Sequence, residues 1–230
     1  MSGFDVIVVG AGIHGAGVAQ AAAAAGHRVL VLEQHHPAYG TSSRSSKLIH
    51  GGLRYLETGQ FRLVRESLHE RALMLKNAPE LVQLKRFYIP LYQQTRRQPW
   101  QIRVGLSLYA VLGGFRTGCR FGTVSRREWS QLDGLNTDGL HSVFCYHDAQ
   151  TDDALLTQSV LRSAQQLGAT LCMPAQLQHA ELHAAGVKVT YLENGHERTA
   201  SGKVLINATG PWVNETLKQV TPAQPIHPIE

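Results

Sequence analysis

The stretch FDVIVVGAGIHGAGVAQAAAAAGHRVLVLE, residues 4–33, decides the fold. It begins with a short apolar run rich in β-branched residues, 4–9, which is typical of a strand buried on both faces. An alanine-rich helix follows and is expected to stop near Gly26. A second apolar run, 28–33, predicts another buried strand. This order predicts a right-handed βαβ unit whose two strands are parallel neighbours.

The glycines after the first strand have the spacing G-x-G-x-x-G, as Gly10, Gly12 and Gly15. The first allows a tight turn, the second lets a pyrophosphate approach the main chain, and the third lets helix and strand pack closely. The helix N-terminus then attracts the diphosphate. Glu33 ends the second strand, where a carboxylate binds an adenosine ribose and disfavours the 2′-phosphate of NADP. The pattern predicts dinucleotide binding and leaves FAD and NAD open.

A second stretch, TSSRSSKLIHGGLRYLE at residues 41–57, combines hydroxyls, cations and paired glycines. Hydroxyl groups can bind phosphate and ribitol oxygens, and Lys47 adds positive charge near a diphosphate or a flavin. By composition alone, the alternative is a loop that solvates itself, with an ordinary turn at Gly51 and Gly52. The hydroxyl donors of this stretch are Thr41, Ser42, Ser43, Ser45 and Ser46.

Composition predicts a soluble globular protein of 230 residues with a net charge of +5. The N-terminus has no basic region followed by a long apolar run, so we expect no signal peptide and a cytoplasmic location. The three cysteines are widely spaced, which argues against a disulfide framework and against a paired-cysteine zinc site. No metal is predicted.

The charge is concentrated in one segment, 81–127, which holds nine cations and no carboxylate. Such a block can attract a phosphorylated substrate, anionic lipid or nucleic acid, or it can be an ordinary solvated surface. Trp100, Tyr109 and Phe115 interleave with its arginines. Because no known nucleic-acid-binding motif accompanies them, we predict no nucleic-acid partner.

The rest of the sequence predicts both helices and strands. Residues 61–79 predict an amphipathic helix that ends before its proline, and 151–169 predict a second helix with a Thr or Asp cap. Residues 187–200 resemble a hairpin with an Asn-Gly turn, and 203–213 predict a last buried strand that runs into a glycine turn. The apolar run at 101–115 is too short and too interrupted to span a bilayer as one helix.

Together these motifs resemble the FAD-dependent glycerol-3-phosphate dehydrogenases. The segments VVGAGIHGAG, VLVLE, TSSRSSKLIHGGLRYLE, FRLVRESLHERALML, DDALL and NATGPWV occur in the family's order. The resemblance covers essentially the whole chain. It implies an α/β fold in which a Rossmann-like, glutathione-reductase-like FAD domain is interleaved with an incomplete antiparallel-sheet substrate domain. The family's chains are about twice as long, so 1–230 is expected to be the N-terminal part of such an oxidoreductase.

The same resemblance assigns the segments and their residues. Segments 1–80 and 145–220 would belong to the FAD domain, and 81–144 would be a substrate-domain segment or insertion. The expected FAD contacts are Gly10, Gly12, Ile13, His14 and Gly15 at the diphosphate; Glu33 and Gln34 at the ribose; Thr41, Ser42, Ser43, Ser46, Lys47, Leu48, Ile49, His50 and Gly51 along the flavin; the main chain near Leu177 at the adenine; and Ala208, Thr209 and Gly210 where the chain returns to the cofactor. His14 departs from the small amide or aliphatic residue usual there.

Substrate contacts follow from the same signature. Arg54 and Tyr55 match positions that face the phosphate of glycerol 3-phosphate, which a guanidinium can bind through two parallel hydrogen bonds. His50 is the candidate catalytic base, because imidazoles exchange protons near neutral pH.

The implied activity is oxidation of sn-glycerol 3-phosphate to dihydroxyacetone phosphate, with electrons passed from FAD to a quinone. The resemblance also implies peripheral contact with the inner face of the cytoplasmic membrane. One alternative is an amine or amino-acid oxidase of the same fold. Another is a non-catalytic FAD-binding fragment, and the isolated chain is expected to be inactive.

Overall fold

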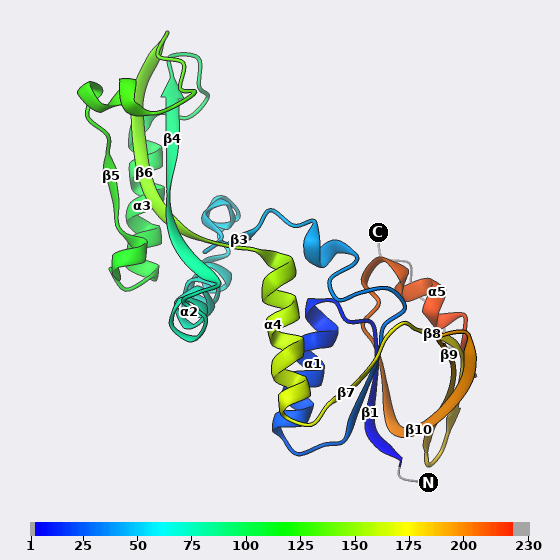
Figure 1. The fold of residues 1–230 in the computed structure, drawn as a ribbon. Coiled ribbons are helices and arrows are strands. Elements are labelled where there is room, and N and C mark those ends of the chain that lie inside the picture. Colours follow the sequence, from blue (N-terminus) through cyan, green and yellow to red (C-terminus); the bar gives the residue numbers. More distant parts are fainter. Residues whose placement is uncertain (1–2, 223–230) are drawn as a thin grey trace. The chain divides into compact units, whose positions relative to one another are not determined.

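The computed structural model describes residues 3–222, which fall into two compact units (Figure 1). One unit comprises Met1–Ser46 and Asp152–Glu230, and the other comprises Lys47–Thr151. The chain therefore leaves the first unit once and returns to it.

The first unit is built on a seven-stranded mixed sheet with the strand order β11-β8-β9-β10-β1-β2-β7. Its strands are β1 (Phe4–Val9), β2 (Val29–Leu32), β7 (Thr170–Cys172), β8 (Ala175–His183), β9 (Gly186–Glu193), β10 (His196–Asn207) and β11 (Val220–Thr221). Its helices are α1 (Ile13–Ala24), α4 (Asp153–Gln166) and α5 (Val213–Leu217), with 3-10 turns η1 (Thr41–Ser43) and η5 (Gly210–Trp212).

The predicted βαβ unit is confirmed. Strands β1 and β2 are parallel neighbours, with Val6 opposite Val29 and Val9 opposite Leu32. Strand β10 pairs in parallel with the other side of β1, and β7 pairs in parallel with β2. Because these four strands are parallel, their carboxyl ends share one edge, which is where α/β sheets bind ligands.

Both faces of β1 and β2 are covered, which explains their nearly continuous apolar sequences. On one face, Val8 and Val31 pack against small residues of α1 and against Leu161 of α4. Figure 1 shows α1 and α4 side by side on this face. On the other face, Ile7 and Leu30 share a core with residues of β8 and β9, because the antiparallel end of the sheet curls over them.

The second unit is an antiparallel sheet, as the resemblance predicts, and it also contains two helices. Its strands are β3 (Leu48–Ile49), β4 (Val82–Tyr92), β5 (Phe121–Thr123) and β6 (Leu140–Thr151). Its helices are α2 (Phe61–Asn77) and α3 (Pro99–Leu112), with 3-10 turns η2 (Leu53–Thr58), η3 (Thr117–Cys119) and η4 (Arg126–Gln131). Strands β3, β4 and β5 all pair antiparallel with β6.

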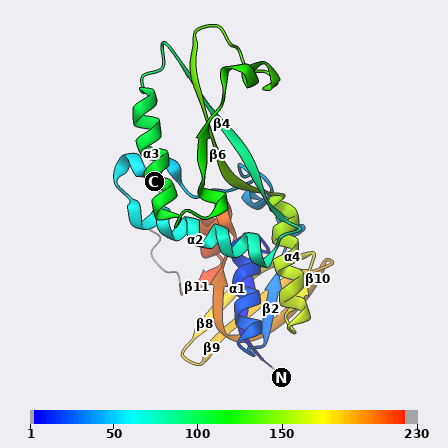
Figure 2. The same cartoon turned by 90° about the vertical axis from the view of Figure 1, so that its left-hand side faces the viewer.

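Helix α2 confirms the amphipathic helix predicted from its sequence. It buries Val64, Leu68 and Arg71, which recur at spacings of four and three. Val64 and Leu68 pack against Tyr109 of α3. Figure 2 shows α3 running beside the long ladder of β4 and β6, and Leu106 of α3 shares a core with residues of both strands.

The limits of the compact units do not coincide with the predicted segment boundaries. The second unit begins at Lys47, well before residue 81, because β3 pairs with the end of β6 and because η2 and α2 pack with α3. Which segments contact FAD stays a prediction, and the predicted limits 1 and 230 lie outside the described residues. The strand predicted within 203–213 does run into a glycine turn, since β10 ends at Asn207 and η5 begins at Gly210. It is not fully buried, however, because Val204 is 48% exposed.

The helices of residues 3–222 are all too short or too polar to cross a membrane. Within the same residues, no group of three or more His, Cys, Asp or Glu side chains is arranged to hold a metal ion.

Candidate functional site

The glycine turn after β1 is required by close main-chain contacts. Gly10 has a φ of +101°, and a Cβ there would lie 2.7 Å from the carbonyl oxygen of Ala208. A Cβ at Gly15 would overlap the carbonyl oxygen of Gly10. By contrast, a Cβ at Gly12 would meet only the Ser42 hydroxyl oxygen, at 3.2 Å. Packing therefore explains Gly10 and Gly15, whereas Gly12 leaves room for a ligand, as a pyrophosphate requires.

The N-terminus of α1 meets the hydroxyl-rich loop. Gly12 is the N-cap residue and supplies no side-chain cap. The N–H of Ile13 donates to the Ser42 hydroxyl at 2.9 Å. First-turn N–H groups have no partner within their helix, and the helix dipole makes this end attractive to anions. The predicted diphosphate residues and Ser42 are thus brought together at one helix end.

The hydroxyl loop is fixed to α4 by a residue that the sequence-based prediction missed, Asp153. Its Oδ2 accepts hydrogen bonds from the main-chain N–H and the hydroxyl of Ser45, at 2.9 and 2.7 Å. Asp153 is only 8% exposed. The neighbouring Asp152 caps α4 by accepting from the N–H of Leu155. One acid therefore caps the helix and the next holds the loop.

Glu33 follows β2 and is buried at the same sheet edge. Its two oxygens accept from the main-chain N–H groups of Ala11 and His35, both at 2.8 Å. These bonds fix the carboxylate beside the glycine turn, and each oxygen retains a further lone pair that can accept from a ribose hydroxyl. Gln34, its predicted partner at the ribose, is exposed.

The third predicted segment returns to the same place. The N–H of Ala208 donates to the carbonyl of Val9 at 2.9 Å, which sets Ala208 beside Gly10. The side chain of Asn207 accepts from the hydroxyl of Thr209 at 2.7 Å and donates to the carbonyl of Val213 at 2.9 Å. Asn207 therefore shapes this turn, a role that the sequence prediction did not assign.

An aromatic contact joins this turn to the loop that precedes the hydroxyls. The rings of Tyr39 and Trp212 are stacked with centroids 6.1 Å apart, and His35 packs on Tyr39 at 4.1 Å. A Cβ at Gly40 would lie 2.8 Å from the Trp212 ring, so the chain must pass close to it. The Arg44 guanidinium donates to the carbonyl of Tyr39 at 2.7 Å.

The second unit contains the rest of the stretch 41–57, from Lys47 onward. Gly52 has a φ of +74°, and a Cβ there would lie 2.7 Å from the ring of Tyr55. The turn η2 follows at once and contains Arg54 and Tyr55, both of which are exposed. His50 is also exposed. A cation, a phenol and an imidazole are therefore available to a ligand within six residues.

The turn η2 is tied to the start of α3 by Glu57. The carboxylate of Glu57 accepts from both terminal nitrogens of Arg97. The hydrogen bonds from Arg97, followed by weaker attraction to Arg97 and Arg54, hold the pKa of Glu57 below its usual value. Glu57 is thus a carboxylate that remains charged beside Arg54.

Comparison with known proteins then identifies the family. The sequence model of the family described as FAD dependent oxidoreductase matches residues 5–230. The chain belongs to this family.

Curated relatives of this FAD dependent oxidoreductase include proteins named D-erythritol 1-phosphate dehydrogenase and glycerol-3-phosphate dehydrogenase. The chain is 39% identical to D-erythritol 1-phosphate dehydrogenase of Brucella abortus over 94% of its length, which is 43% of that relative. It is 39% identical to glycerol-3-phosphate dehydrogenase of Pseudomonas aeruginosa, covering 95% of this chain and 43% of the relative. The chain spans less than half the length of these relatives.

Solved structures share the fold. Glycerol-3-phosphate dehydrogenase from Bacillus halodurans, complexed with FAD, matches 95% of this chain and 36% of its own with a TM-score of 0.68 at 24% identity. L-alpha-glycerophosphate oxidase from Mycoplasma pneumoniae with FAD bound matches 96% and 57%, with a TM-score of 0.70 at 19% identity. Glycine oxidase from Geobacillus kaustophilus matches 94% and 58%, with a TM-score of 0.67 at 20% identity.

FAD is the cofactor of this family, and the first unit fits it. The space at Gly12, the helix end at Ile13 and the buried carboxylate of Glu33 meet at the carboxyl edge of the parallel strands. The individual contacts with FAD stay predictions. The structure places the predicted FAD residues up to Ser46, with Ala208 to Gly210, in the first unit, and it places Lys47 to Gly51 in the second.

Leu177 also lies in the first unit, on β8. Its side chain is 4% exposed and belongs to the core that contains Leu32. The pairing of β8 with β9 shifts register between Leu177 and His179. The ladder is therefore irregular where the main chain is predicted to meet the adenine.

Proposed function

We propose that this chain is part of an enzyme that oxidises sn-glycerol 3-phosphate at its secondary alcohol to dihydroxyacetone phosphate. The names of the curated relatives support a phosphorylated polyol as substrate. The observation that carries the proposal is the turn η2, which exposes Arg54 and Tyr55 together. An amine offers Arg54 no anionic group to bind. An amino acid offers a carboxylate, which a guanidinium also binds, so the names of the curated relatives favour the phosphorylated alcohol.

The chemistry assigns one task to each residue. Arg54 binds the phosphate through its planar pair of N–H donors, and Tyr55 adds a third donor. These contacts orient the carbinol carbon before reaction. His50 takes the hydroxyl proton as the carbon–hydrogen bond breaks. FAD, when bound, supplies the hydride acceptor.

The test compares the binding of phosphorylated substrates with the binding of FAD. The FAD-loaded chain is titrated calorimetrically with sn-glycerol 3-phosphate, D-erythritol 1-phosphate and unphosphorylated glycerol. We expect Arg54→Ala to weaken binding of the phosphorylated ligands by more than tenfold, because a hydrogen bond to a charged group contributes about 1.5–3 kcal/mol. FAD content, read from the visible flavin band, should not change.

The matched control is Arg62→Ala, since Arg62 is an exposed arginine of the same unit whose partner is Glu66. It should leave both ligands unaffected. Equal losses of FAD and phosphate ligand in Arg54→Ala would refute the assignment, as would binding of an amino acid with no affinity for either polyol phosphate.

For the electron acceptor we propose a quinone, reached by peripheral contact with the inner face of the cytoplasmic membrane. Helix α3 and the residues after it expose a row of apolar side chains. These are Trp100 (65% exposed), Val104 (59%), Val111 (54%) and Phe115 (64%). Arg96 and Arg103 add charge that favours anionic lipid. Arg97 is held by Glu57.

Flotation with vesicles tests this surface. The chain should float with phosphatidylglycerol vesicles at low salt and much less with phosphatidylcholine vesicles. The double substitution Trp100→Asp and Val104→Asp should abolish flotation. Leu167→Asp changes a comparably exposed apolar residue of the first unit and should not. Equal flotation of the double variant and the unchanged chain would exclude this helix as the contact.

We also infer that the 230 residues alone turn over substrate slowly at best. Arg54 and Tyr55 contact one side of a phosphate, and a mobile dianion needs further contacts before its carbinol hydrogen is oriented. The relatives contain more than twice as many residues, which can supply them. Anaerobic addition of glycerol 3-phosphate should therefore leave the flavin band of the FAD-loaded chain nearly unchanged. Rapid bleaching would contradict this inference.

A further inference from the structure

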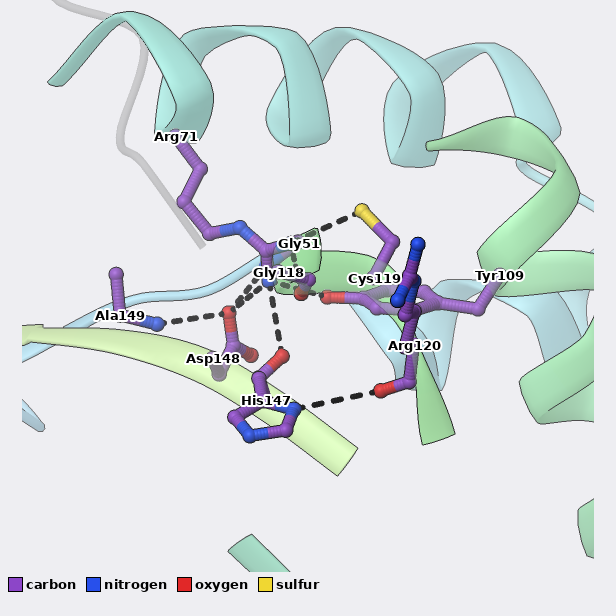
Figure 3. A network of polar contacts seen from close by, with 9 residues as sticks. All are labelled: Gly51, Arg71, Tyr109, Gly118, Cys119, Arg120, His147, Asp148 and Ala149. Carbon is purple, nitrogen blue, oxygen red and sulfur yellow. Dashed lines mark hydrogen bonds and ion pairs between the residues drawn. The ribbon is translucent and has the colours of Figure 1, made fainter. Parts of the chain in front are cut away.

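A buried ion pair joins α2 and β6 in the second unit. Arg71 of α2 and Asp148 of β6 are 2% and 3% exposed, and their Nη1 and Oδ1 atoms are 2.7 Å apart. Figure 3 shows the Arg71 side chain reaching from the helix toward Asp148, with Tyr109, Gly118 and Cys119 grouped around the guanidinium. The ion pair therefore joins elements that are far apart in the sequence.

Both terminal nitrogens of the guanidinium donate to named partners. Nη1 also donates to the Tyr109 hydroxyl at 3.0 Å and to the carbonyl of His147 at 3.2 Å. Nη2 donates to the carbonyl of Gly118 at 2.7 Å. Burial lowers the pKa of Arg71, but attraction to Tyr109 and the bond to Asp148 outweigh it, so its pKa lies above the usual value. Arg71 is charged at all physiological pH values.

The Asp148 carboxylate contacts the stretch 41–57 at Gly51. The main-chain N–H of Gly51 donates to Oδ1 of Asp148 at 3.1 Å, the same oxygen that accepts from Arg71. Gly51 is also enclosed, because a Cβ there would overlap the Tyr109 hydroxyl and a methyl group of Leu68. One hydrogen bond and the surrounding contacts thus fix the main chain at this residue.

Gly51 lies between the groups that the proposed function uses. His50 precedes it directly, and η2 with Arg54 and Tyr55 begins two residues later. We propose that Arg71 and Asp148 are positioning residues that hold the main chain at Gly51 and thereby orient His50 and the η2 turn. This inference rests on the proposed function for its consequence in binding, but the positioning itself can be measured independently.

Stability alone is a weak reason for this ion pair. Apolar residues of similar volume often replace a buried pair at no cost in stability, whereas loss of one partner leaves an uncompensated buried charge. What apolar residues cannot supply is an acceptor for the Gly51 N–H. Positioning and stabilisation can therefore be separated by removing one charge or both.

The experiment measures hydrogen exchange of the full 230-residue chain by mass spectrometry, in peptides spanning residues 48–58. Three variants are compared: Asp148→Asn, Arg71→Lys, and the double variant Arg71→Met with Asp148→Leu. Arg62→Met, on the same helix but in an exposed ion pair with Glu66, is the matched control. Thermal unfolding of each variant is recorded in parallel.

We expect exchange in residues 48–58 to accelerate at least tenfold in the double variant, which has no acceptor for the Gly51 N–H, and less in Asp148→Asn, whose amide oxygen can still accept from it. Peptides of β1 and β2 should stay protected. The double variant should unfold near the temperature of the unchanged chain. Arg62→Met should match the unchanged chain in both hydrogen exchange and unfolding temperature. The proposal would be overturned if residues 48–58 of the double variant were as well protected as in the unchanged chain. It would also be overturned if every variant lost protection equally in all peptides. If the double variant does not fold, Arg71→Lys decides, because it keeps a charge beside Asp148 but cannot reproduce all the guanidinium's bonds to Tyr109 and Gly118. Faster exchange at 48–58 in Arg71→Lys would support the proposal, and unchanged exchange would overturn it.

A second measurement follows the consequence for the ligand. The dissociation constant of sn-glycerol 3-phosphate, determined on the FAD-loaded chain, should rise at least tenfold in the double variant and stay unchanged in Arg62→Met. A longer protein that contains these 230 residues, loads FAD and binds no glycerol 3-phosphate would refute the proposed function, while the exchange result would still decide the positioning role. Faster exchange with unchanged affinity would overturn the link between Gly51 and the η2 turn.

Discussion

The main-chain N–H of Ala11 donates to Oε2 of Glu33 at 2.8 Å, across 22 residues of sequence. The bond joins the glycine turn after β1 to the end of β2, and the N–H of His35 holds the other oxygen. A residue expected to bind a ribose is therefore also part of the protein's own framework.

Glu33→Gln should reduce both stability and FAD affinity. The amide keeps one acceptor oxygen but turns an NH₂ group toward a buried N–H donor, and an unsatisfied buried group costs about 1–3 kcal/mol. Chemical unfolding without FAD measures the first effect, and flavin titration measures the second. Glu197→Gln, at an exposed position of β10, is the control. A stability equal to that of the unchanged chain would show that Glu33 serves the ligand alone.

Gly15→Ala and Gly17→Ala should have opposite effects, although both lie on α1. A Cβ at Gly15 would overlap the Gly10 carbonyl oxygen, so we expect destabilisation at or above the upper end of about 1–3 kcal/mol. A Cβ at Gly17 meets nothing within 4 Å, so alanine there should stabilise the helix by about 0.5–1 kcal/mol. Urea denaturation distinguishes the two. Similar shifts in the same direction would contradict the packing described for α1.

Gly12→Ala should separate ligand binding from folding. The new methyl group would meet only the Ser42 hydroxyl, at 3.2 Å, so the chain should fold with nearly unchanged stability. FAD binding should weaken at least tenfold, about 1.4 kcal/mol, because the methyl group occupies the approach of the diphosphate. The flavin spectrum after gel filtration measures this. Normal flavin content would mean that the diphosphate lies elsewhere.

Asp5 predicts a pH dependence of stability. The side chain of Lys203, then the main chain and side chain of Arg28, hold the pKa of Asp5 well below its usual value of 3.8. Because this pKa is lowered on folding, the stabilisation is present above about pH 4 and is lost as the pH falls further. Asp5→Asn should lower the melting temperature at pH 7, and the difference should shrink below pH 4. A difference that is constant with pH would exclude this ion pair as its cause.

The sequence by itself determined the βαβ unit and the family. Apolar runs of strand length, the glycine spacing and the terminal Glu33 all depend on local chemistry, and the structure confirms β1, α1 and β2. The amphipathic α2, the capped α4 and the hairpin of β9 and β10 were predictable for the same reason. Their patterns are repeated within a few residues, so they can be recognised without knowing their tertiary partners.

Only the tertiary structure decided which distant residues hold these segments in place. Asp153 fixes the hydroxyl loop across 108 positions, and Asp148 fixes Gly51 across 97. The sequence does not distinguish Arg71 from the exposed charged residues of the same amphipathic helix, yet the structure buries it. Such contacts have no local signature, because any carboxylate or guanidinium can make them. Burial alone makes each specific, since a charge removed from water must find its partner within the protein.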